Sequence, residues 1–228
     1  MAWLPLESNP DVMNKFMQTL GVEDKWSFVD VYGLDGETLQ WVPRPVLAVM
    51  LLFPCNDKFE EFAKEECEQI KQKGQTISPT VYFMKQFVSN ACGTVALIHS
   101  IANNLDKINI SDGLFKSTLE SSINMTPDER GTLLTNTGGG ISEIADSLAK
   151  EGQTEVSPNM RVYHHFVAFV CKDGSLYELD GRRDFPINRG PSSPEKLLED
   201  AAKICKEYIE REPNEVSFTV MALAASEK

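Results

Sequence analysis

The longest apolar run in the chain, Val46-Leu-Ala-Val-Met-Leu-Leu-Phe53, constrains the fold more than any other segment. Pro43 and Pro45 precede the run and disfavour helical backbone at its start, and its length is typical of a strand. Because consecutive strand residues point to opposite faces, an apolar run without polar alternation predicts a strand that is buried on both sides. A sheet that contains such a strand must be covered by helices on both faces.

The remaining segments supply those helices and further strands. Strands are expected at residues 26–31, 46–53, 162–171, 175–179 and 215–223. Helices are expected at residues 10–20, 58–73, 90–104, 113–123, 126–137, 141–150 and 193–211, with Gly138-Gly139-Gly140 as a break between two of them. No linker or repeat divides the chain. We therefore expect one α+β domain over residues 1–228, with a central, largely antiparallel sheet flanked by helices.

Charge and hydropathy exclude two classes of partner. The formal net charge is −12, from 34 acidic against 22 basic side chains, whereas binding of nucleic acid needs a basic surface. No apolar run approaches the roughly 20 residues of a membrane helix. We therefore expect no nucleic acid and no membrane as partners. The acidity is compatible with steering of a basic partner, and equally with a role in solubility alone.

The five cysteines are odd in number and irregular in spacing, which argues against a disulfide framework and favours a reducing compartment. They form no Cys-x-x-Cys pair with histidines at metal spacing, so we expect neither a zinc site nor a cofactor. The first residues lack the pattern of a secretory signal. These features predict a cytoplasmic protein, with the nucleus as a further expected location, and we expect a monomer.

Among the cysteines, Cys92 stands apart. It lies in Asn90-Ala-Cys-Gly93, at the first turn of the expected buried helix, where free amides and the helix dipole favour a thiolate. The backbone amide of Cys92 is also placed to hold an oxyanion. The structural alternative is a small buried residue at a helix start, which is how we interpret Cys55, Cys67, Cys171 and Cys205.

The chain has three histidines from which a base for Cys92 can be drawn. His99 is seven residues further along the same helix, a rise of about 10.5 Å, and cannot reach the sulfur. His164 and His165 are neighbours on a strand and point to opposite faces. If Asp173-Gly174 forms a two-residue hairpin turn, the register makes His165 and Asp180 diagonal neighbours on one face. A shift of the strand pairing by one residue would place His164 instead of His165 on the face of Asp180. The alternative interpretation of Asp180 is a turn residue without a role in catalysis.

Three motifs resemble the ubiquitin carboxyl-terminal hydrolase family: Gln86-Phe-Val-Ser-Asn-Ala-Cys92-Gly-Thr, His165-Phe-Val-Ala and Leu176-Tyr-Glu-Leu-Asp180-Gly-Arg. The similarity extends over nearly the whole chain and is closest to the short, single-domain isozymes of the L1 and L3 types. It implies a papain-like cysteine protease fold with a knotted backbone. It also implies a catalytic set of Cys92, His165 and Asp180, with Gln86 as an oxyanion donor, a role that residue type and position alone do not indicate.

The resemblance implies further contacts with ubiquitin. The segment from Glu151 to Arg161, which includes Gly152 and Pro158, resembles the crossover loop that arches over the active site in this family, and it is short here. Glu7, Asp11 and Asp30 are expected to help capture the basic tail of ubiquitin. The glycine run at Gly138–Gly140 departs from the family pattern, and we expect it to affect the loop rather than the catalytic residues.

The expected function is removal of small amide, ester or thioester adducts and short peptides from the terminal glycine of ubiquitin, with ubiquitin-like modifiers as further candidate substrates. Two alternatives stay open. One is a protein that binds and stabilises ubiquitin with little turnover. The other is a papain-like peptidase for unrelated peptides, because such enzymes share the order of cysteine, histidine and a final Asn or Asp.

Overall fold

The protein was analysed as a computed structural model, which describes residues 2–152 and 163–226, and at residues 137–139 the helical backbone alone. In chain order the elements are α1 (Pro10–Thr19), β1 (Trp26–Asp30), the short 3-10 helix η1 (Thr38–Trp41), β2 (Val46–Pro54), α2 (Asp57–Lys73), α3 (Cys92–Ala102), α4 (Leu114–Ser122), α5 (Pro127–Ala149), β3 (His164–Lys172), β4 (Ser175–Leu179), β5 (Ile187–Pro191), α6 (Leu197–Arg211) and β6 (Thr219–Ala225).

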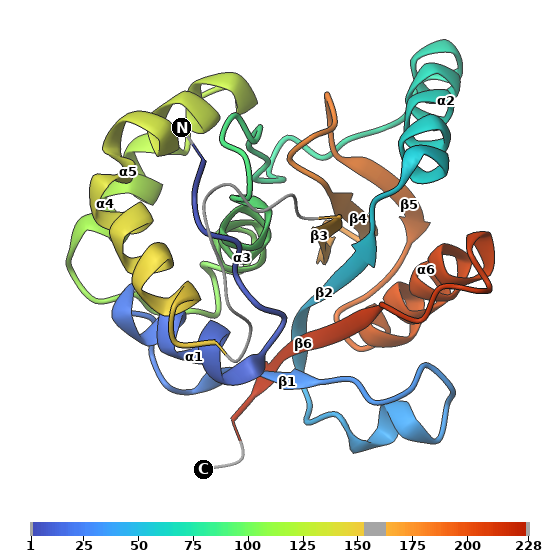
Figure 1. Cartoon of the computed structure of the whole chain (residues 1–228), viewed down its shortest axis with the longest axis horizontal. Coiled ribbons are helices and arrows are strands. Elements are labelled where there is room, and N and C mark those ends of the chain that lie inside the picture. The colour runs from blue at the N-terminus through green and yellow to red at the C-terminus, as the bar shows by residue number, and fades with distance from the viewer. Residues whose placement is uncertain (1, 153–162, 227–228) are drawn as a thin grey trace.

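The strands form one antiparallel sheet in the order β1-β6-β2-β3-β4-β5 (Figure 1). The apolar run predicted to be buried on both sides is β2, which pairs with β6 on one edge and β3 on the other. All its residues are buried except Leu52, which is half-buried. The expectation of an α+β domain with helices on both faces of an antiparallel sheet is therefore confirmed.

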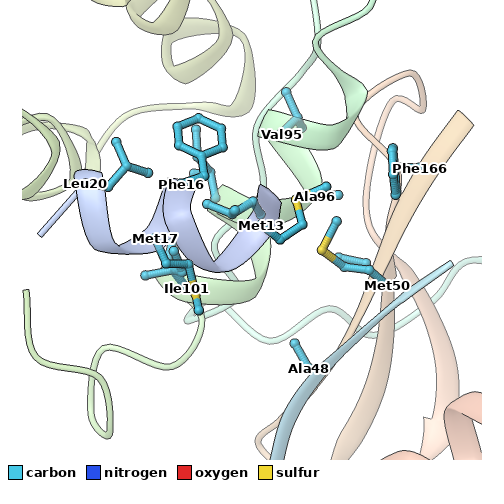
Figure 2. Close-up of a cluster of buried hydrophobic side chains, with 14 of the residues drawn as sticks. Met13, Phe16, Met17, Leu20, Ala48, Met50, Val95, Ala96, Ile101 and Phe166 are labelled. Atoms are coloured by element: carbon cyan, nitrogen blue, oxygen red, sulfur yellow. The ribbon is translucent and has the colours of Figure 1, made fainter. Parts of the chain in front are cut away.

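One face of the sheet is covered by α1, α3, α4 and α5 (Figure 1). The buried face of α1 presents Met13, Phe16 and Met17 toward α3, and Met50 on β2 closes the same cluster from the sheet (Figure 2). Asn9 caps α1, because its side chain accepts the N–H of Asp11. All of α3 is buried, so this helix is held by packing around its whole circumference.

The other face carries α6 and the start of α2. Helix α6 buries Leu197, Leu198 and Cys205 against β2 and β3. In helix α2, Phe59 is the one fully buried residue, and four further apolar residues are only half-buried: Phe62, Ala63, Cys67 and Ile70. Most of α2 is thus attached to the body by polar contacts rather than by a continuous apolar stripe.

The expected break at Gly138–Gly140 is wrong: α5 continues from Pro127 through the glycines to Ala149. Glycine lowers helix propensity by about 1 kcal/mol per residue, and packing on both sides of the run outweighs this cost. Leu134 lies before the run and Ile141, Ala145 and Leu148 lie after it, and all four are buried in the core. Thr126 and Glu129 form a capping box at the start of the helix.

Two smaller differences have local causes. Strand β5 was not predicted, because Ile187–Pro191 contains one strongly β-forming residue and owes its place to pairing with β4. Helix α6 begins at Leu197, later than expected, since the residues after Ser193 form a turn. The segment expected to form the crossover loop, from Glu151 to Arg161, lies from residue 153 onward outside the described residues, and so does this part of the expected knotted path. Within the described residues, no helix has both the length and the apolar character needed to cross a membrane.

A close approach at Gly131 fixes the segment that carries Gln86. A Cβ at this position of α5 would lie 2.3 Å from the carbonyl oxygen of Lys85. The N–H of Lys85 donates to the carbonyl of Pro127 at 3.0 Å, and Arg130 Nη1 donates to the carbonyl of Phe83 at 2.8 Å. The first turn of α5 therefore holds residues 83–86 in place.

Gly131→Ala is expected to lower the free energy of unfolding by about 1–3 kcal/mol, because the helix and the Lys85 carbonyl must move apart. Urea unfolding followed by circular dichroism measures the change. Gly36→Ala is the matched control, since a Cβ there meets no atom within 4 Å. Equal stability of the two variants would contradict the close approach.

Candidate active site

Cys92 is the first residue of α3 and is buried, as the sequence predicted. Ala91 precedes it without a side-chain cap, so the amides of the first helical turn are not used by a capping side chain. Gly93 allows close packing next to the sulfur, because a Cβ there would lie 3.1 Å from Leu6 and 3.4 Å from the ring of Phe166. The nucleophile candidate therefore lies at a helix start with free backbone donors.

The hairpin of β3 and β4 has the predicted register. Lys172 pairs with Ser175 and Ala168 with Leu179, across a turn whose Asp173 and Gly174 have φ values of 46° and 77°. This register places Asp180 directly after β4, on the side of His165. His165 Nε2 and Asp180 Oδ1 are 2.6 Å apart, and both side chains are buried.

The carboxylate of Asp180 is held from two directions. Its Oδ1 also accepts the backbone N–H of Arg182 at 2.9 Å. Burial opposes ionisation of Asp180, yet the charge and the hydrogen bond of His165 lower the pKa of this carboxyl to about 2. Burial likewise lowers the pKa of His165, but the Asp180 carboxylate and the Cys92 sulfur outweigh it and raise that pKa to about 9.

His165 links this carboxylate to Cys92. Because Nε2 faces Asp180, Nδ1 is the ring nitrogen left for the sulfur, and among the described residues it has no partner that meets the geometry of a hydrogen bond. Burial raises the pKa of the Cys92 thiol, and the hydrogen bond and charge of His165, with the amide of Phe166, lower it below its ordinary value. The lowered pKa of Cys92 and the raised pKa of His165 both favour transfer of the thiol proton to the imidazole, and with Asp180 behind the ring this is an arrangement for nucleophilic catalysis.

Comparisons with known proteins agree with this geometry. The family model described as "Ubiquitin carboxyl-terminal hydrolase, family 1" matches residues 3–210. The chain is 48% identical over its whole length, and over all of the relative, to a ubiquitin carboxyl-terminal hydrolase of Drosophila melanogaster. It is 46% identical, over 96% of each chain, to ubiquitin carboxyl-terminal hydrolase isozyme L1 of Homo sapiens.

The chain belongs to the ubiquitin carboxyl-terminal hydrolase family. The fold agrees as well: the crystal structure of the Trichinella spiralis UCH37 catalytic domain bound to ubiquitin vinyl methyl ester superposes with a TM-score of 0.76 at 23% identity. That match covers 100% of this chain and 97% of the other. The resemblance drawn from the sequence motifs is therefore confirmed, and with it the class of cysteine-type deubiquitinating peptidases.

Gln86 lies beside the turn that follows Asp180. Its backbone N–H donates to the carbonyl of Gly181 at 2.8 Å, which ties it to the turn after Asp180. Its side-chain Nε2 donates to the carbonyl of Val88 at 3.0 Å, and this bond fixes the orientation of the amide. One amide N–H remains for another acceptor. The oxyanion role of Gln86 stays a prediction that this free donor supports.

The other two histidines behave as expected from the sequence. His99 is fully buried, accepts the N–H of Met84 at 3.0 Å through Nε2 and stacks on Phe83. Burial lowers the pKa of His99 to about 4, so the ring is neutral at physiological pH. His164 is half-buried and lies one residue from His165 on the strand, so its side chain points to the opposite face.

The expected ubiquitin contacts fall into separate regions. Asp11 is on α1 and Asp30 ends β1, and they are near enough that Asp11 adds to burial in raising the pKa of Asp30. Glu7 lies against Gly152, where a Cβ would be 2.7 Å from its Oε2, and Glu151 pairs with Lys15 at 2.7 Å. Pro158 and Arg161 lie outside the described residues.

Sequence reasoning missed two parts of the surroundings of Cys92. The first is the N-terminal segment, in which Trp3 receives the Asn90 side chain and donates its N–H to Ser89. Asn90 has φ of 65°, and asparagine tolerates this left-handed conformation, so its type was a usable signal. The second is Arg183, whose Nε lies 3.8 Å from Oδ2 of Asp180.

His165→Asn is expected to reduce kcat about 100-fold or more, because the base is removed, whereas His164→Asn should leave kcat close to that of the unmodified protein. Steady-state hydrolysis of a fluorogenic ubiquitin amide measures both. The adjacent position is the matched control for strand damage. A larger loss of kcat in His164→Asn than in His165→Asn would mean that the base is His164, on the opposite face of β3.

His99→Gln is expected to flatten the dependence of stability on pH. The folded-state pKa of His99, about 4, lies below its unfolded value of 6.5, so its stabilisation is complete above pH 6.5 and is lost as the pH falls toward 4. Between pH 7 and pH 5 the unmodified protein should lose about 2 kcal/mol more unfolding free energy than His99→Gln. Urea titrations at both pH values test this, and equal losses would contradict it.

Proposed function

We propose that this protein is a deubiquitinating cysteine hydrolase that removes small groups from the carboxyl terminus of ubiquitin, with Cys92 as nucleophile. The observation that carries the proposal is the contact of 2.6 Å between His165 Nε2 and Asp180 Oδ1, with the ring turned to Cys92 at the start of α3. Membership of the family supplies the substrate.

The reaction follows from the positions of the groups. The Cys92 sulfur, whose proton resides on His165, attacks the carbonyl carbon of the terminal glycine of ubiquitin. The backbone amide of Cys92 and the free N–H of Gln86 are the donors proposed for the oxyanion. The imidazolium then gives its proton to the leaving amine or thiol. Water, deprotonated by His165, hydrolyses the thioester and releases ubiquitin with a free carboxylate.

Two features bear on the range of substrates. The segment that resembles the crossover loop is short, and a contour of about 3.5 Å per residue makes a ring that a folded protein does not pass. Small amines, thiols and short peptides are therefore the leaving groups we propose, from ubiquitin and also from ubiquitin-like modifiers. Glu7, Asp11 and Asp30 are proposed to attract the basic tail, which the net charge of −12 favours at long range.

The expected cellular setting also remains a proposal. We propose that the protein acts as a monomer in the cytoplasm, and in the nucleus as well. The support is the reduced state of Cys55, Cys67, Cys92, Cys171 and Cys205.

The experiment that tests the function is reaction with ubiquitin whose C-terminal glycine is replaced by a vinyl methyl ester. We expect one adduct, mapped by mass spectrometry to Cys92, which is absent in Cys92→Ala although that variant still binds ubiquitin. Cys55→Ser is the matched control and should still form the adduct, because Cys55 is not needed for attack. Ubiquitin with a small C-terminal amide should be cleaved much faster than di-ubiquitin.

Several outcomes would separate the alternatives. Binding without an adduct on Cys92, and without turnover of the small amide, would indicate a protein that stabilises ubiquitin. Turnover of unrelated peptides that intact ubiquitin does not inhibit would indicate a general papain-like peptidase. Equal rates on the small amide and on di-ubiquitin would contradict the proposed limit on the leaving group.

A further inference from the structure

A buried network of charged side chains lies behind the catalytic carboxylate. Glu178, on β4 two residues before Asp180, is fully buried. Its Oε1 accepts the hydroxyl of Tyr208 at 2.7 Å, and its Oε2 accepts Nη2 of Arg189 at 2.7 Å and Nε of Arg189 at 2.9 Å. A charge in this position is stable only while its partners are present. Strands β4 and β5 are therefore joined to α6 by charged groups.

Glu66 brings α2 into the same network. Its carboxylate pairs with Arg189 and, at 2.7 Å, with Nη1 of Arg183. This contact is a main attachment of α2, which buries only Phe59 fully against the apolar core. The network therefore connects a loosely packed helix to the turn that follows Asp180.

Arg183 is the member that touches the catalytic set. Its Nε lies 3.8 Å from Oδ2 of Asp180, the oxygen that His165 does not use, and its Nη2 lies 3.7 Å from Glu178. The side chain is 5% exposed, and Nε makes no hydrogen bond to the described residues. The positive charge of Arg183 thus interacts with three carboxylates at once, those of Asp180, Glu66 and Glu178.

The charges of this cluster do not cancel. The carboxylates of Glu66, Glu178 and Asp180 face the guanidinium groups of Arg183 and Arg189, which leaves three negative charges against two positive charges. The excess negative charge lies beside His165, where it favours the imidazolium although the ring is buried. Removing a negative or a positive charge from this cluster therefore changes the electrostatic field at the His165 ring.

We propose that Glu66 and Arg183 are positioning residues of the hydrolase, which set through Asp180 how strongly His165 holds its proton. The inference rests on the proposed function, since it concerns the base of that reaction. In the described structure, neither residue forms an ion pair with Cys92 or His165. Their influence comes from the ion pairs that run from α2 through Arg183 to Oδ2 of Asp180.

The two residues act in opposite directions. Without the positive charge of Arg183, Asp180 is more available to His165 and the imidazolium persists to higher pH. Without the negative charge of Glu66, the guanidinium of Arg183 interacts more strongly with the Asp180 carboxylate. The imidazolium of His165 then loses its proton at lower pH. A purely structural role predicts no such opposition, because loss of either partner would disturb the same contact.

Other charged and titratable groups surround Asp180 and His165 and stay unchanged in the comparison. Cys92 and His99 on α3, Cys55 after β2 and Arg182 in the turn act on Asp180 or His165, while Glu178 on β4 and Tyr208 on α6 act on Arg183, and Arg189 on β5 shares its glutamates. The cavity beside Asp180 and His165 is also lined by charged residues of α2 and of the turn after Asp180: Glu60, Lys64, Glu68, Lys71 and Asp184. They contribute equally to every variant, so differences between variants report Glu66 and Arg183.

The test is the pH dependence of kcat/KM on the fluorogenic ubiquitin amide for Glu66→Gln and Arg183→Met. The alkaline limb of the profile should move down by about one pH unit in Glu66→Gln and up by a similar amount in Arg183→Met. The double variant restores the net charge of the cluster and should bring the limb back toward that of the unmodified protein. Glu65→Gln, on the exposed face of α2, is the matched control and should not move the limb.

Alkylation of Cys92 by iodoacetamide, followed by mass spectrometry across the same pH range, gives a second readout that needs no ubiquitin. It separates failure of this inference from failure of the proposed function, because the thiolate–imidazolium pair can be followed without turnover. If Arg183→Met does not fold, the proposal is tested with Glu66→Gln and Arg183→Lys. The alkaline limb of the pH profile should then lie at the same pH in Arg183→Lys as in the unmodified protein, because the positive charge is kept. Shifts of the same sign in Glu66→Gln and Arg183→Met, or none in Glu66→Gln, would overturn the proposal.

Discussion

The antiparallel pairing of β3 with β4 is the constraint on which the catalytic arrangement depends. The two-residue turn at Asp173-Gly174 permits one register, and alternation along the strand then decides that His165 rather than His164 lies beside Asp180. The hydrogen bond between these two side chains orients the ring so that its other nitrogen is directed to Cys92. A shift of one residue in the pairing would remove the base, the orienting carboxylate and the activated thiol together.

The second half of the site depends on α3. Because this helix is buried on all sides, its first residue has a fixed place, and the segment before it is fastened to its far end. Asn103 exchanges hydrogen bonds with the backbone of Tyr82, and His99 accepts the N–H of Met84. Gln86 is thereby positioned by residues of the same helix that carries Cys92. The buried polar groups of α3 act as anchors for the oxyanion candidate.

Electrostatics connects this local geometry to the rest of the protein. Burial alone would favour a neutral His165 and a protonated Cys92, and the Asp180 carboxylate reverses this preference at the ring. The Asp180 carboxylate in turn lies next to Arg183, which is paired with the glutamates of the buried network. Helix α2, which lies away from the apolar core, is therefore part of the electrostatic surroundings of the active site.

The sequence by itself predicted the α+β class, the buried central strand and the hairpin register, and it offered Cys92, His165 and Asp180 as candidates that the family resemblance then joined into one set. These depend on local patterns: apolar runs, caps, turn residues and strand alternation. Tertiary structure alone decided that α5 continues through Gly138–Gly140, that β5 joins the sheet and that Arg183 lies against Asp180. The apolar core around the glycine run, the pairing partner of β5 and the Glu66 carboxylate that holds Arg183 come from other elements of the fold, and no local pattern records how close those elements lie.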